Sequence, residues 1–127
     1  MWNKIKIDKV DKTFALYVKG KAHWKCEYCG KDFSDNHQGL QVSHYFGRAS
    51  ENTRYDPENC NAFCVYHHHW LGHGNGREEY RDFKIKQLGE KGFNLLRWRS
   101  NQYRKKDRKL EFLIAKKLLE ELKNDIL

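Results

Sequence analysis

The sequence predicts a small α+β protein, in which two short strands and a metal-binding turn form a core between helical ends. Cys26 and Cys29 form a Cys-x-x-Cys pair. The same spacing recurs at Cys64 and His67, as is typical of a divided metal site. Two runs between the helical ends alternate in polarity as strands do. Apolar residues recur at helical spacing near both ends.

Composition limits the class of protein. A chain of 127 residues is long enough for one domain with a modest core. We expect that core at about residues 22–76, with a helical flank at 1–21 and a helical extension at 77–127. Hydrophobic residues make up only 39%, and the mean hydropathy is −1.00, so a bound metal would strengthen a thin core.

The sequence also predicts the cellular setting. No apolar run approaches the roughly 20 residues of a membrane span, and the N-terminus lacks a signal segment. We therefore expect no membrane partner and a cytoplasmic location. In that reducing environment metal binding is favoured over disulfide formation for the four cysteines. A secreted protein with disulfides is the alternative.

The secondary structure follows from local signals. Val10, Phe14 and Val18 recur at helical spacing after Asp8, which predicts a helix at 8–19. Glycine at position 30 permits a tight turn after the first cysteine pair. The other expected elements are strands at 40–46 and 60–63 around a polar loop at 47–59, a helix beginning near Val65, and helices at 77–88 and 105–124.

The last expected helix carries an apolar stripe. Its members are Leu110, Ile114, Leu118 and Leu122. Such a stripe indicates either packing onto the core or the seam of a homodimer.

The charge distribution indicates an anionic polymer as partner. The formal net charge is +8. Seven basic residues lie within 97–109 and seven lysines within 1–25, whereas the histidine-rich centre is almost neutral. Two basic flanks would hold a phosphate backbone across a central site. The alternative is two solvated helical faces.

The cysteine spacing predicts a zinc site. Two thiolates on one turn converge on a tetrahedral ion, and a second half-site must supply two more ligands. The predicted ligands are Cys26, Cys29, Cys64 and His67. Cys60 competes for a place, but two residues four apart in an extended strand are separated by roughly 13 Å. The spacing therefore favours Cys60 as a small buried hydrophobe.

One histidine stands apart from the others. Hydrolysis of a phosphodiester needs an activated water and a cation that neutralises developing charge. His44 lies on a predicted strand, and an imidazole is largely unprotonated yet basic near neutral pH. His44 is therefore the candidate general base, and a structural histidine beside Tyr45 is the alternative.

The order of His44, Asn59 and His68 resembles the HNH endonuclease family, which has a ββα-metal fold. In that family a general-base histidine ends the first strand, an asparagine begins the second, and a metal-binding histidine follows a cysteine pair at the start of a helix. Asn59 stands five residues before Cys64, as in the family pattern, and His67 replaces the second cysteine. The resemblance implies that Asn59 holds the loop and orients His44, while His68 binds the catalytic ion.

Shorter segments look like the NinG-like phage recombination proteins. These are Ser43-His44-Tyr45, residues 53–59, Tyr80-Arg81 and residues 87–89, and the resemblance covers about residues 10–98. It implies a metal-dependent DNA endonuclease that leaves 5′-phosphate and 3′-hydroxyl ends. It further implies a role in DNA recombination or branched-DNA processing, in the host cytoplasm if the chain is phage-encoded.

The catalytic metal site has few predicted ligands. Many HNH enzymes carry Asp or His before the base, where this chain has Ser43, and Gly72 occupies the position four residues after His68. We expect His73 to assist His68, with His69 and His73 as a shifted alternative. A site with so few protein ligands suits Mg²⁺ or Mn²⁺. An inactive, zinc-stabilised nucleic-acid-binding module is the competing function.

Two loop arginines are candidates for binding DNA. Arg48 and Arg54 lie near His44 in the sequence and could clamp a phosphate through bidentate hydrogen bonds. The alternative is solvated loop arginines. The NinG-like pattern includes Arg54 and favours a function for it.

Overall fold

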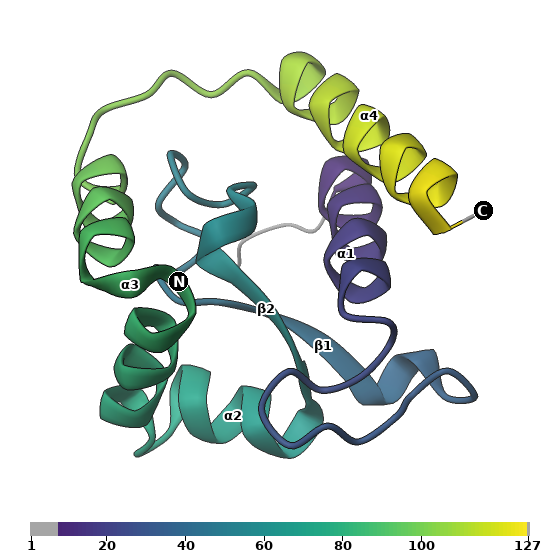
Figure 1. Cartoon of the computed structure of the whole chain (residues 1–127). Coiled ribbons are helices and arrows are strands. Elements are labelled where there is room, and N and C mark those ends of the chain that lie inside the picture. The colour runs from purple at the N-terminus through teal and green to yellow at the C-terminus, as the bar shows by residue number, and fades with distance from the viewer. Residues whose placement is uncertain (1–7, 127) are drawn as a thin grey trace, which may run out of the picture.

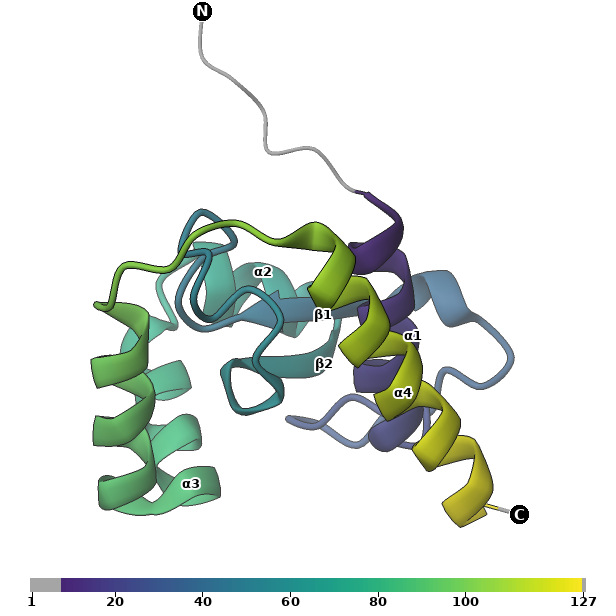
Figure 2. The ribbon, with the colours of Figure 1, turned by 90° about the horizontal axis from the view of Figure 1, so that it is seen from above.

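A two-stranded antiparallel sheet lies between two pairs of helices in the computed structural model, which describes residues 8–126 (Figure 1). Helices α1 and α4 lie together on one side, and α2 and α3 on the other (Figures 1 and 2). The elements are α1 (Lys9–Lys21), β1 (Leu40–His44), β2 (Cys60–Cys64), α2 (Val65–His73), α3 (Arg77–Ser100) and α4 (Arg108–Ile126). Short 3-10 turns at His37–Gly39 and Pro57–Asn59 precede the strands. The α+β class is confirmed.

Helix α1 begins with a capping box. The side chain of Asp8 accepts hydrogen bonds from the backbone N–H groups of Val10 and Asp11, and the Asp11 carboxylate accepts one from the Asp8 N–H. Val10, Phe14 and Val18 are buried, which confirms the predicted stripe. The rest of the expected N-terminal flank, residues 1–7, lies outside the described residues.

The sheet brings the two halves of the predicted core together. His44 pairs with Cys60 and Ser43 pairs with Asn61. All five residues of β2 are buried. β1 ends at His44, two residues before the predicted end, although the Tyr45 N–H still donates to the Asn59 carbonyl at 2.9 Å.

Helix α3 is longer than the sequence predicts. The expected helix stops at Leu88, but α3 continues to Ser100 across a kink at Gly89, whose φ is +76°. Glycine adopts this left-handed conformation without steric cost, so the chain bends and then resumes the helix. Phe93 and Leu96 are buried beyond the kink, and this burial stabilises the second segment.

Helix α4 packs on α1 in a different register from the predicted stripe. Leu110 and Ile114 are 45% and 41% exposed, while Ala115 is buried. Leu118 and Leu122 are half-buried, and a Cβ on Gly20 of α1 would lie 3.0 Å from Leu122 Cδ2. The prediction that Leu110 and Ile114 pack in the core is therefore wrong. The homodimer seam stays a prediction, which sedimentation can test. Among the helices within residues 8–126, none has the length and apolar character needed to cross a membrane.

Candidate metal centre and active site

The predicted zinc ligands come together in space. Across residues 8–126, one group of His, Cys, Asp or Glu side chains has the geometry to hold a metal ion, and its members are Cys26, Cys29, Cys64 and His67. Their ligand atoms all lie within 4.8 Å of one another. His67 Nδ1 is 3.2 Å from Cys64 Sγ. Three sulfurs and one imidazole nitrogen are a donor set that zinc accepts in tetrahedral sites, so this group could bind a zinc ion.

Backbone contacts build the cysteine turn and attach it to the sheet. Gly30 has a φ of +79°, and its N–H donates to the Cys26 carbonyl at 2.8 Å. The Glu27 N–H donates to the Ala62 carbonyl at 2.8 Å, and the Glu27 carboxylate accepts from the Ala62 N–H at 2.5 Å. These contacts place the turn beside the end of β2, where Cys64 lies.

Cys60 is separate from the metal-binding group. It is buried on β2, and its thiol donates a weak hydrogen bond to the Arg54 carbonyl at 3.8 Å. Burial raises the pKa of this thiol well above its ordinary value. Cys60 is therefore a protonated core residue, which agrees with the prediction that it is a small buried hydrophobe.

The candidate catalytic histidines share one cleft. His44, His68, His73 and Arg48 line a space of about 330 Å³, together with Asp11, Lys12 and Lys19 of α1. The rings of His68 and His73 are 5.1 Å apart, centroid to centroid. His69 is exposed and does not line this space. The shifted pair of His69 and His73 is therefore not favoured by this geometry.

The imidazole of His44 is oriented by a backbone carbonyl. Its Nε2 lies 2.9 Å from the Arg54 oxygen. A carbonyl can only accept a hydrogen bond, so this contact assigns the proton to Nε2 and leaves Nδ1 with the lone pair. Burial lowers the pKa of His44 to about 4, and the nearby positive charge of Arg48 acts in the same direction. His44 is consequently neutral at pH 7.

Asn59 holds the loop that contains this carbonyl. Its buried side chain accepts from the Phe46 N–H at 2.8 Å and donates to the carbonyls of Phe46 and Thr53, both at 2.9 Å. Asn59 does not line the cleft. It is a positioning residue, because it fixes the backbone next to Arg54.

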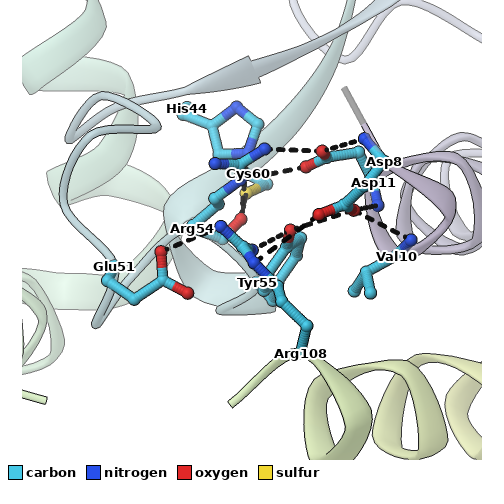
Figure 3. A network of polar contacts seen from close by, with 9 residues as sticks. All are labelled: Asp8, Val10, Asp11, His44, Glu51, Arg54, Tyr55, Cys60 and Arg108. Atoms are coloured by element: carbon cyan, nitrogen blue, oxygen red, sulfur yellow. Dashed lines mark hydrogen bonds and ion pairs between the residues drawn. The ribbon is translucent and has the colours of Figure 1, made fainter. Parts of the chain in front are cut away.

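The prediction that Arg54 clamps a phosphate is wrong. The residue is only 4% exposed, and its guanidinium makes a bidentate pair with Asp11 at 3.0 and 2.5 Å (Figure 3). Figure 3 shows the Arg54 side chain between His44 and Asp11. The two donors that would grip a phosphate thus bind a carboxylate of α1. Arg48 lines the cleft, and its role in binding a DNA phosphate stays a prediction.

Ser43 and Gly72 contribute to the site in a way that sequence reasoning missed. In the described part of the chain, Ser43 Oγ and His68 Nδ1 are buried without a hydrogen-bond partner. A Cβ on Gly72 would lie 3.1 Å from Ser43 Oγ and 3.9 Å from His68 Nδ1. Glycine therefore keeps a small polar cradle open. The available signal was that Gly72 follows His68 by one helical turn.

His68 and His73 place two imidazole rings side by side in the cleft. Burial lowers the pKa of His68 to about 4, and the neighbouring His73 adds to this effect, so the ring is in the neutral form that ligates metals. Burial also leaves a polar nitrogen of His68 without a partner. Two imidazoles alone would give a divalent ion only a weak site.

The two predicted basic flanks differ in their surroundings. Arg99 pairs with Asp56 and Glu58, and the C-terminal flank also pairs Arg104 with Glu111. On the N-terminal side, Lys12 and Lys19 line the cleft, while Lys4 and Lys6 fall outside the described residues. The C-terminal arginines therefore serve the fold at least in part.

No family model, curated protein or solved structure matched this chain.

Proposed function

We propose that this chain is a zinc-stabilised DNA endonuclease of the HNH type, built on a ββα-metal core. The observation that carries the proposal is the shared cleft, where His44 from the end of β1 meets His68 and His73 from α2. In β1, β2 and α2 the chain follows the order of elements that the family resemblance implies. Arg48 adds a positive charge at the same place.

In the proposed reaction His44 acts as general base. Its Nε2–H is held by the Arg54 carbonyl, so Nδ1 accepts a proton from a water molecule. The water oxygen then bonds to phosphorus, and the bond from phosphorus to the 3′ oxygen breaks. The products are a 5′-phosphate and a 3′-hydroxyl end, the latter after protonation by solvent.

His68 and His73 would hold the catalytic divalent ion, which we propose to be Mg²⁺ or Mn²⁺. When bound, such an ion stabilises negative charge on the phosphate and on the leaving oxygen. The protein's own part is to present neutral imidazoles and to keep the Gly72 cradle free of side-chain atoms. Asn59 and Arg54 act through the loop that orients His44.

The narrower proposal is phage DNA recombination, with branched DNA as substrate, in the host cytoplasm. It is supported by the NinG-like segments. In the structure Tyr80 of one such segment is buried, and its hydroxyl donates to the Ser43 carbonyl and to Asn61 Oδ1. This segment therefore supports the strand that carries His44.

A plasmid-nicking assay tests the proposal. Zinc-loaded protein is incubated with supercoiled plasmid, with or without added Mg²⁺ or Mn²⁺. EDTA is avoided, because a chelator would also remove the structural zinc. We expect nicking that requires the added ion and falls by at least about 100-fold in His44→Ala, since general bases contribute roughly 10² to 10⁴.

His69 provides the matched control. His68→Ala should abolish metal-dependent nicking, whereas His69→Ala, on the same helix but outside the cleft, should retain it. Equal loss in both variants would contradict the assigned site.

A second candidate is a zinc-stabilised module that binds nucleic acid without cleaving it. One observation favours it: within residues 8–126, the cleft histidines do not form a group of three or more metal-binding side chains. Plasmid binding without nicking under every metal condition would support the module over the enzyme.

A further inference from the structure

Helix α1 adds positive charge to one side of the cleft, and a role for this charge in binding DNA rests on the proposed function. Lys12 and Lys19 line the cleft from α1, seven residues apart and thus two helical turns. Arg48 lines it from the loop after β1. Three cationic side chains therefore share the space with the candidate histidines.

These cations have no counterion within the described chain. No carboxylate of residues 8–126 forms an ion pair with Lys12, Lys19 or Arg48. The one acidic residue that lines the cleft, Asp11, is already paired with Arg54. The cleft is therefore left with excess positive charge that an anion could neutralise.

The C-terminal basic flank is arranged differently. Arg99, Arg104 and Arg108 all pair with carboxylates of the chain itself. Lys105 and Lys106 are exposed in the segment between α3 and α4, and neither lines the cleft. Of the two flanks, the N-terminal one thus places its unpaired charge beside the candidate histidines.

We infer that α1 is the phosphate-binding wall of the cleft, where Lys12 and Lys19, together with Arg48, bind successive phosphates of one DNA strand next to His44. Lysine suits this task, because it contacts phosphate as a point charge without reading bases. Burial lowers the pKa of Lys19, and a neighbouring phosphate would offset that effect. Binding should therefore be insensitive to sequence and strongly dependent on salt.

The test measures binding without cleavage. Fluorescein-labelled oligonucleotides are titrated with zinc-loaded His44→Ala protein, without added Mg²⁺ or Mn²⁺, over a series of salt concentrations. In this background Lys12→Gln/Lys19→Gln should weaken binding roughly tenfold and reduce the slope of log affinity against log salt by about 1 for each lysine removed. Lys12→Arg/Lys19→Arg should retain the affinity and the slope, which separates an effect of lost charge from an effect of lost fold.

Lys105→Gln/Lys106→Gln is the matched control, since it removes the same charge from the other flank. It should change affinity and slope much less. An unchanged slope in the α1 variant, or an equal change in the two variants, would overturn the inference. Because this assay requires no nicking, it can support the α1 wall even if the nuclease proposal fails.

Discussion

The Nε2 of His44 lies 2.9 Å from the carbonyl oxygen of Arg54, and the side chain of Arg54 is bound by Asp11 (Figure 3). The candidate base is therefore oriented by a loop, and that loop is anchored to α1. The same helix carries Lys12 and Lys19 at the cleft. Helix α1 thus supports the site although it lies outside the ββα unit.

Breaking the Asp11–Arg54 pair should strongly destabilise the protein. The side chains are only 10% and 5% exposed, so Asp11→Asn would remove the carboxylate that forms a bidentate pair with the buried guanidinium. We expect a loss of about 3 kcal/mol in the free energy of unfolding, measured with urea on zinc-loaded protein. Asp35→Asn, at an exposed position, should have little effect. Similar losses in both variants would refute the role of the pair.

Stability should depend on pH through His44. Its pKa is about 4 in the folded chain, against 6.5 for the free side chain, chiefly because of burial. Between these values the unfolded state binds more protons, so the contribution to stability is complete above pH 6.5 and is lost as pH falls toward 4. When the pH falls from 7 to 5, the free energy of unfolding, measured with urea, should decrease by about 2 kcal/mol less in His44→Gln than in the wild type. An equal decrease in the two proteins would contradict the lowered pKa of His44.

Gly72→Ala should separate stability from metal binding. The new methyl group would lie 3.1 Å from Ser43 Oγ and would crowd the cradle beside His68. Alanine is the better helix former by about 1 kcal/mol, which offsets part of the crowding. We therefore expect a melting temperature within a few degrees of the wild type and weaker Mn²⁺ binding, followed by electron paramagnetic resonance. His69→Ala is the control, and it should leave Mn²⁺ binding intact.

Zinc content should distinguish the four cysteines. We expect about one zinc ion per chain, because the four clustered ligands complete a single tetrahedral site. Cys64→Ser should lose the metal and much of the folded structure, as measured by elemental analysis and circular dichroism. Cys60→Ala should retain the metal, since its thiol lies outside the group. Loss of zinc in Cys60→Ala would show that the ligand set is misassigned.

The sequence by itself determined the features that depend on local spacing. The stripe of Val10, Phe14 and Val18 specified α1, and the repeated Cys-x-x-Cys and Cys-x-x-His spacing specified each half of the metal-binding group. Each half-site lies on one turn of chain, so its geometry follows from a few neighbouring residues. The two strands around the loop could likewise be predicted from the alternation of apolar and polar residues and from the turn residues between them.

Only the tertiary structure decided which distant groups meet. The sequence offered Arg54 as a phosphate ligand, but folding brings it to Asp11, 43 residues away, and a buried guanidinium requires such a partner. Packing of α4 on α1 likewise turned Leu110 outward, and packing of α2 on β1 set Gly72 against Ser43. A sequence states which donors, acceptors and apolar surfaces exist, whereas their pairing depends on how whole elements pack together.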